Sequence, residues 1–83
     1  MDVRMDGRKA IITGGSAGLG KAMAIEFNRS GADVVIVGRR PDALDAAKTE
    51  IETASDGKVA AISADIRLAL DCERVVREAE AAI

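Results

Sequence analysis

Apolar residues along the chain follow two patterns, short continuous runs and stretches with helical spacing. The continuous runs lie in Lys9–Thr13, Asp33–Val37 and Lys58–Ser63. Apolar residues that are continuous over this length are typical of parallel strands covered on both faces. We therefore expect strands at these three places, joined by helical segments.

The first helical stretch is expected from Gly18 or Gly20 to about Ser30. Its apolar stripe has residues four apart with one small residue beside them, namely Leu19, Met23, Phe27 and Ala22. This pattern leaves Asn28 off the stripe. Gly31 follows where a left-handed helix cap is expected.

The second helical stretch begins at Pro41, a residue suited to the first turn of a helix. Its apolar positions recur at i, i+3, i+7 and i+10 and are Leu44, Ala47, Ile51 and Ala54. The third stretch is periodic from Cys72 onward, through Val75, Val76, Ala79 and Ile83. The preceding Leu68-Ala69-Leu70 is either the first turn of that helix or a loop packed on it.

The alternation of strands and helices with short connections predicts a parallel sheet with right-handed crossovers. We expect residues 1–83 to form an α/β structure, a partial Rossmann (doubly wound) fold with three parallel strands and crossover helices. In that fold a fourth strand lies beside the first. None is predicted here, so we expect Ala10-Ile11-Ile12 to be an open edge where the chain meets a second copy or the remainder of a longer protein. For the same reason we expect only partial burial of Val75, Val76 and Ala79.

Composition narrows the possible functions. Apolar residues make up 48% and charged residues 31%, and the net charge is −2, so the chain is globular and has no basic stripe for nucleic acid. The aliphatic run Val34–Val37 is too short to span a membrane. The single cysteine allows no internal disulfide, and a cytoplasmic location is expected. There is no histidine and no tyrosine, so we assign no catalytic or metal-binding residue.

The segment Thr13 to Gly20 holds four glycines in eight residues. Glycine is kept where φ must be positive or where another group must approach the main chain closely. A turn that leads into a helix also presents free N–H groups and the positive end of the helix dipole, which suit a phosphate. We therefore place a nucleotide pyrophosphate over this turn.

Two phosphate-binding motifs compete for these glycines. The triphosphate-binding pattern G-x-x-x-x-G-K-[ST] is met from Gly15 to Lys21, but Ala22 stands where a hydroxyl would ligate Mg²⁺. Asp65, at the end of a strand, could imitate the second magnesium-site aspartate. A degenerate triphosphate loop therefore stays as an alternative.

The other pattern, T-G-x-x-x-G-x-G, is matched at Thr13, Gly14, Gly18 and Gly20. Here the chain resembles the short-chain dehydrogenase/reductase family, whose cofactor turn has this spacing. The resemblance runs from Lys9 to Ile83. It implies that Gly14, Gly18 and Gly20 shape the turn, while N–H groups around Ser16 and Leu19 face the pyrophosphate.

The end of the second strand bears on the choice of cofactor. Gly38 stands where relatives that use NAD carry an acidic residue, and Arg39 and Arg40 follow it. A guanidinium binds a 2′-phosphate that a carboxylate would repel, so the resemblance implies NADP (NADPH) rather than NAD. Ala17 occupies a place where relatives that prefer NADP often carry a second basic residue, so Arg39 would discriminate with help from Arg40 and Ser16. The alternative is that both arginines are solvated loop charges.

The third match lies after the third strand. Asp65-Ile66 corresponds to the residues that border the adenine ring in the family, with the carboxylate accepting a hydrogen bond from the exocyclic amine. Alternatively, Asp65 caps the next helix. Arg67 follows where the family more often has a small hydroxyl residue.

The resemblance implies the cofactor-binding part of an oxidoreductase that transfers hydride between NADP(H) and a carbonyl or alcohol. The family's catalytic serine, its Y-x-x-x-K pair and its N-N-A-G stretch are all missing. We expect a segment truncated before the fourth strand and inactive alone. A different class of function, a non-enzymatic dinucleotide-binding or assembly module, stays open.

Overall fold

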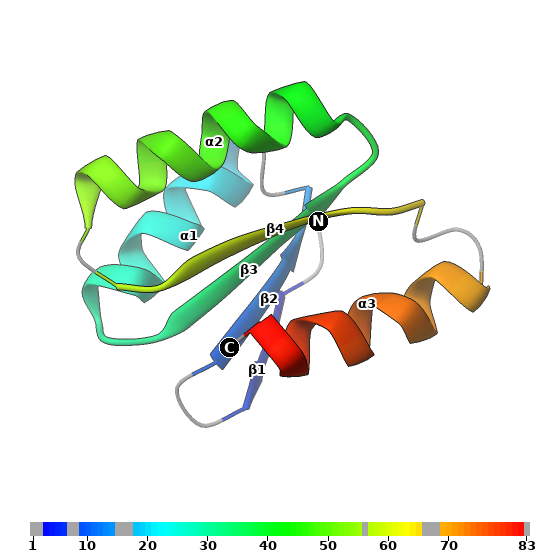
Figure 1. Cartoon of the computed structure of the whole chain (residues 1–83). Coiled ribbons are helices and arrows are strands. Elements are labelled where there is room, and N and C mark those ends of the chain that lie inside the picture. The colour runs from blue at the N-terminus through cyan, green and yellow to red at the C-terminus, as the bar shows by residue number, and fades with distance from the viewer. Residues whose placement is uncertain (1–2, 7–8, 15–17, 56, 66–68, 83) are drawn as a thin grey trace.

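The computed structural model of the chain describes residues 3–6, 9–14, 18–55, 57–65 and 69–82. Its elements are, in chain order, β1 (Val3–Asp6), β2 (Lys9–Thr13), α1 (Gly18–Arg29), β3 (Asp33–Gly38), α2 (Pro41–Ala54), β4 (Val59–Ser63) and α3 (Ala69–Ala82). The three expected strands and three expected helices are all present (Figure 1). The third helix begins at Ala69, ahead of the periodic pattern from Cys72.

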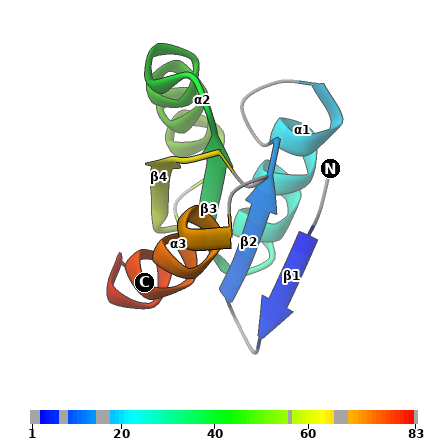
Figure 2. The ribbon, with the colours of Figure 1, turned by 90° about the vertical axis from the view of Figure 1, so that its right-hand side faces the viewer.

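The strands form one sheet in the order β1-β2-β3-β4. Strands β2, β3 and β4 are parallel, with Ile11 opposite Val35 and Val35 opposite Ala60. This confirms the partial doubly wound fold with three parallel strands. Helices α1 and α2 cover one face of the sheet and α3 covers the other (Figures 1 and 2).

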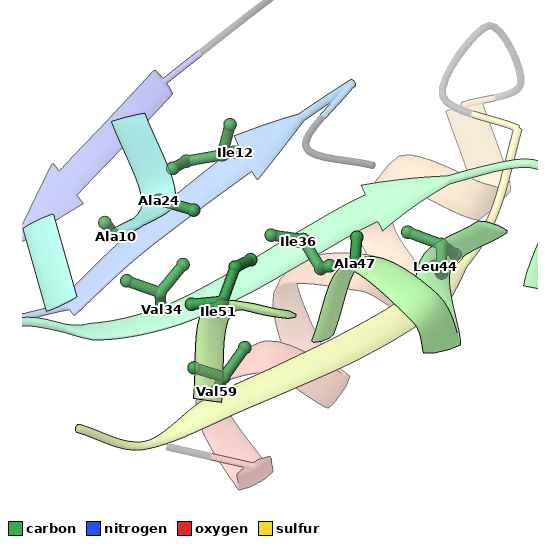
Figure 3. Packing of buried hydrophobic residues seen from close by; sticks show 9 residues of the cluster. All are labelled: Ala10, Ile12, Ala24, Val34, Ile36, Leu44, Ala47, Ile51 and Val59. Carbon is green, nitrogen blue, oxygen red and sulfur yellow. The ribbon is translucent and has the colours of Figure 1, made fainter. Parts of the chain in front are cut away.

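The central strand β3 explains why the apolar runs are continuous. Its side chains alternate between the two faces, and Val34 to Val37 are all buried without exposed surface. Val34 and Ile36 pack in the cluster under α1 and α2, which Figure 3 shows, while Val35 and Val37 pack under α3. A strand with helices on both faces has no solvent side to place polar residues on.

The burial of α1 differs from the predicted stripe. The buried residues are Gly20, Ala24 and Asn28, whereas Leu19 is 68% exposed and Ala22 is exposed. Met23 and Phe27 are only partly buried beside the cluster. The stripe was wrong by one residue because the small side chains of Gly20 and Ala24 let the helix lie close against the sheet.

The predicted apolar face of α2 is largely confirmed, since Leu44, Ala47 and Ile51 are buried and Ala54 is half-buried. The expectation for α3 was wrong at two positions, because Val75 and Ala79 are only 4% and 1% exposed. They pack on side chains of β3 and β4, strands that the chain itself supplies. Val76 is half-buried as expected, while the side chain of Cys72 and the residue Ile83 lie outside the described part.

The edge of β2 is covered, which corrects the expectation of an open edge. β1 pairs antiparallel with β2, with Val3 opposite Ile12 and Asp6 opposite Lys9. The sequence patterns predicted no strand before Lys9, so they missed β1 and its pairing with β2.

The buried side chain of Asn28, in α1, bonds to residues next to the carboxyl end of α2 and the amino ends of β3 and β4. Its Nδ2 donates to the carbonyl oxygens of Ala32 (3.0 Å) and Lys58 (3.1 Å). Its Oδ1 accepts hydrogen bonds from the Ser55 hydroxyl and from the Gly57 N–H. The amide is satisfied on both sides, so a polar residue is stable in a place that is 3% exposed.

Candidate functional site

The carboxyl ends of the three parallel strands lie level at one edge of the sheet (Figure 1). Pairing continues just past the strands, where the Gly14 N–H donates to the Val37 carbonyl (2.9 Å) and the Ala64 N–H donates to the Gly38 carbonyl (2.8 Å). The segments that follow β2, β3 and β4 therefore leave the sheet side by side. Ligands of open parallel sheets bind at such an edge.

The glycines at both ends of the turn after β2 have left-handed backbones, with φ of +72° at Gly14 and +57° at Gly18. A Cβ atom added to either would meet no heavy atom within 4 Å. These glycines are therefore required by backbone conformation and leave open space above the main chain, instead of being packed against a neighbour. The predicted contact residue Ser16 lies outside the described residues.

Helix α1 begins at Gly18, so its amino end lies at this edge. Gly20 is buried in the first turn of α1. Leu19 is the opposite case, a large apolar side chain that is 68% exposed beside the turn. An apolar side chain in this position is available to a ligand that lies over the turn.

Arg39 and Arg40 follow β3 directly, and both are exposed. Within the described residues neither guanidinium forms a hydrogen bond or an ion pair with the protein. Arg40 is the N-cap of α2 and has an extended backbone, its carbonyl accepts the Leu44 N–H (3.0 Å), and Pro41 fills the first helical position. Two positive charges therefore stand unpaired one strand away from the glycine turn.

Gly38 precedes this pair at a closely packed position. An added Cβ there would come within 3.4 Å of Leu44 Cδ2. In dinucleotide-binding folds, an acidic residue at this place binds the ribose 2′-hydroxyl. Here the residue is a glycine that is covered by Leu44 of α2.

Asp65 lies two residues past β4 and is half-buried. It lies at the same edge as the glycine turn and the arginine pair, since the Ala64 N–H before it bonds the Gly38 carbonyl. Ile66 and Arg67 lie outside the described residues.

Sequence reasoning missed one residue at this edge. Arg74 of α3 donates from Nη2 to the Ser63 carbonyl oxygen (2.8 Å) and pairs through Nη1 with Glu78 Oε2 (2.6 Å). The i, i+4 spacing of an arginine and a glutamate was the only available signal, and that spacing normally indicates nothing more than a solvent-exposed helix pair.

Taken together, the edge offers main-chain N–H groups at a helix terminus, two free guanidinium groups and one carboxylate. This set suits a ligand with phosphate groups.

No described helix is long and apolar enough to cross a membrane.

A family model described as short chain dehydrogenase matches residues 8–83. Among curated proteins, a 3-ketodihydrosphingosine reductase from Aspergillus fumigatus is 41% identical over 78 residues, which cover 89% of this chain and 21% of that protein. A probable 2,4-dienoyl-CoA reductase from Bacillus subtilis is 40% identical over 75 residues, covering 90% of this chain and 29% of that protein.

Solved structures agree with the match. The L-sorbose reductase from Gluconobacter frateurii, complexed with NADPH and L-sorbose, superposes with a TM-score of 0.86 at 30% identity, over 100% of this chain and 32% of its own. A short-chain dehydrogenase from Sphingobium yanoikuyae in complex with NADPH gives a TM-score of 0.71 at 37% identity, over 81% of this chain and 27% of its own.

This chain therefore spans between 21% and 32% of the length of these four proteins. The matched region contains the glycine turn, all three parallel strands and the helices between them. With the family model covering residues 8–83, the chain belongs to the short-chain dehydrogenase/reductase family of oxidoreductases, which bind a nicotinamide dinucleotide.

Proposed function

We propose that this chain is the NADP(H)-binding segment of a short-chain dehydrogenase/reductase. The observation that carries the proposal is the pair of unpaired guanidinium groups, Arg39 and Arg40, one strand away from the open glycine turn. Neighbouring strands lie about 4.8 Å apart, so the turn and the arginines are close enough to hold the pyrophosphate and the 2′-phosphate of one ligand.

The described residues fit the cofactor. The space above Gly14 and Gly18 leaves the main chain open to a pyrophosphate, and α1 begins at Gly18, so its amino end lies at the same edge. The N–H groups around Ser16 and Leu19 would face that pyrophosphate. Asp65, with Ile66 beside it in the sequence, would read the adenine ring.

We expect this site to bind NADP more tightly than NAD, because the positive charges of Arg39 and Arg40 attract the 2′-phosphate that NAD lacks. A guanidinium binds a phosphate through two parallel hydrogen bonds, and neither arginine has to leave a protein partner to do so. Gly38 places no carboxylate where it would repel the 2′-phosphate. The structures of the two solved relatives named above both contain NADPH, which supports the same choice.

The whole enzyme would transfer hydride between the nicotinamide and a carbonyl or alcohol carbon. In the proposed division of labour, this chain binds and orients the cofactor, while the acid/base and substrate-binding residues are supplied by sequence that this chain does not contain. The chain has no tyrosine, so we expect cofactor binding without turnover. The cytoplasmic location stays a prediction.

Two alternatives predict different ligands or partners. A degenerate triphosphate loop would bind Mg²⁺ with ATP or GTP, although Ala22 offers no hydroxyl to the metal. An assembly module that uses the β2 edge, through a second copy or the remainder of the enzyme, would require another strand to take the place of β1.

Calorimetric titration of NADP⁺ and NAD⁺ into the chain tests the proposal. Arg39→Ala should weaken NADP⁺ binding by roughly ten- to a hundredfold and leave NAD⁺ almost unchanged, since a hydrogen bond to a charged group contributes ~1.5–3 kcal/mol. Arg77→Ala, which removes an exposed arginine from α3, is the matched control and should change neither affinity.

Equal losses for both dinucleotides would remove Arg39 from the phosphate site. A heat signal with magnesium triphosphate that NADP⁺ does not compete away would favour the triphosphate loop instead.

A further inference from the structure

We propose that Arg74 is a positioning residue for the adenine side of this site, holding the segment from Ser63 to Asp65 in the shape that reads the cofactor. The role rests on the proposed function. Arg74 belongs neither to the glycine turn nor to a strand, but to the second turn of α3. It acts through the main chain and not by touching the ligand.

Arg74 and β3 hold opposite sides of the same peptide group. The carbonyl of Ser63 and the N–H of Ala64 belong to one planar trans unit and point in opposite directions. The N–H donates to the Gly38 carbonyl at 2.8 Å, and the oxygen accepts from Arg74 Nη2 at 2.8 Å. With both ends bonded, this peptide plane cannot rotate without breaking one of the two hydrogen bonds.

The position of β4 explains why an arginine is needed there. β4 is the last strand in the sheet order, so its outer carbonyl groups have no neighbouring strand in the described sheet. Figure 1 shows α3 returning along the sheet after β4. Arg74 thus bonds a carbonyl that no neighbouring strand reaches, at the Ser63–Ala64 peptide, one residue before Asp65.

The guanidinium is itself held in place. Nη1 pairs with Glu78 Oε2 at 2.6 Å, one helical turn along α3. The next residues in the sequence, Val75 and Ala79, are buried against the sheet, which fixes the helix below the pair. The Arg74 and Glu78 side chains remain 36% and 49% exposed, so solvent weakens the ion pair. The hydrogen bond to the Ser63 carbonyl is the contact that acts on this peptide.

This arrangement connects the two groups proposed to read the adenosine end. Ala64 is followed by Asp65, and its partner Gly38 is followed by Arg39. Loss of the Arg74 contact would let the peptide rotate and lower the fraction of molecules in which Asp65 faces the ligand. The apparent dissociation constant rises in proportion as that fraction falls.

The test compares Arg74→Met with Arg77→Met, a change of the same kind three residues along α3 at an exposed position. NADP⁺ and inorganic pyrophosphate are titrated into each ¹⁵N-labelled chain and followed by amide chemical shifts. Pyrophosphate reaches the glycine turn without an adenine ring, so a general loss of structure weakens both ligands, whereas a positioning role weakens only NADP⁺.

We expect Arg74→Met to weaken NADP⁺ by about three- to tenfold, the effect of reducing the competent fraction to between a third and a tenth. Pyrophosphate binding and the Arg77→Met chain should be unchanged. Exchange of the Ala64 amide with solvent should speed up in Arg74→Met whether or not ligand is present, because its peptide is then held on one side only.

Unchanged NADP⁺ affinity in a folded Arg74→Met chain would overturn the positioning role and leave the proposed function intact. Failure of the unaltered chain to bind any dinucleotide would overturn the proposed function, and the adenine role of Arg74 with it. If Arg74→Met does not fold, Arg74→Ala decides, because alanine is the best helix former and also removes the guanidinium from the Ser63 carbonyl. An NADP⁺ affinity of Arg74→Ala equal to that of the unaltered chain overturns the role.

Discussion

Removal of the Asn28 side chain is the sharpest test of how this fold is held together. Its amide makes four hydrogen bonds to residues that lie in three separate segments, at Ala32, Ser55 and the pair Gly57-Lys58. At about 0.5–1.5 kcal/mol each, these bonds amount to about 2–6 kcal/mol. Alanine is the better helix former and offsets about 0.5 kcal/mol of this, so Asn28→Ala should cost about 1.5–5.5 kcal/mol.

That loss is large for a chain of this length, whose total stability is about 4–12 kcal/mol. Urea denaturation followed by circular dichroism should show a lower midpoint with an unchanged slope, because the surface exposed on unfolding hardly changes. Glu52→Ala, at an exposed position on α2, serves as the control and should stay within about 0.5 kcal/mol of the unaltered chain.

Gly57 gives the same reasoning a second and stricter test. A Cβ on this residue would lie 2.7 Å from Asn28 Cγ and 2.8 Å from Asn28 Oδ1, so Gly57→Ala should displace the amide and lose the same bonds. In the Asn28→Ala background the obstructing atoms are gone, and the second substitution should cost little. The double-mutant cycle should therefore give a coupling of about 2 kcal/mol or more. Costs that simply add, or an Asn28→Ala chain as stable as the control, would refute this account.

Two further predictions concern the backbone. Gly31→Ala should cost about 1 kcal/mol in the same denaturation experiment, because φ is +98° and the residue closes α1 through the Ala32 N–H to Phe27 carbonyl bond (3.0 Å); an unchanged midpoint would contradict the cap. Deletion of residues 1–6 should remove amide-exchange protection along the uncovered edge of β2 and make the chain self-associate with rising concentration, as seen by light scattering. A deleted chain that stays monomeric, with the β2 amides still protected, would show that β1 does not cover this edge in solution.

Most of the fold was predictable from local patterns. Continuous apolar runs placed β2, β3 and β4, because strands buried on both faces carry no polar side. The spacing of Leu44, Ala47 and Ile51 gave the buried face of α2. Pro41 and Gly31 marked a helix start and a helix end through backbone geometry that each residue strongly favours.

The candidate site was predictable as far as main-chain chemistry defines it. Glycine spacing identified the turn, and the parallel order brought Arg39 and Asp65 to the same edge. Arg74 escaped notice because its partner is a carbonyl oxygen, and every residue of a chain carries one. Only the packing of α3 beside β4 selects Ser63 among them.

The sequence alone determined the order of strands and helices, the glycine turn and the family resemblance, since these follow from periodicity and from residues with restricted backbones. The tertiary structure decided which side chains of α1 are buried, what covers the β2 edge and why Asn28 lies inside. Each of these three features depends on the distance between two segments that are far apart in the sequence. The periodicity of a helix carries no information on that distance. In α1 the buried face includes Gly20 and Ala24, each one residue after a position of the predicted stripe. Asn28 then lies inward only because Ser55 and Gly57 arrive from elsewhere in the chain to satisfy it.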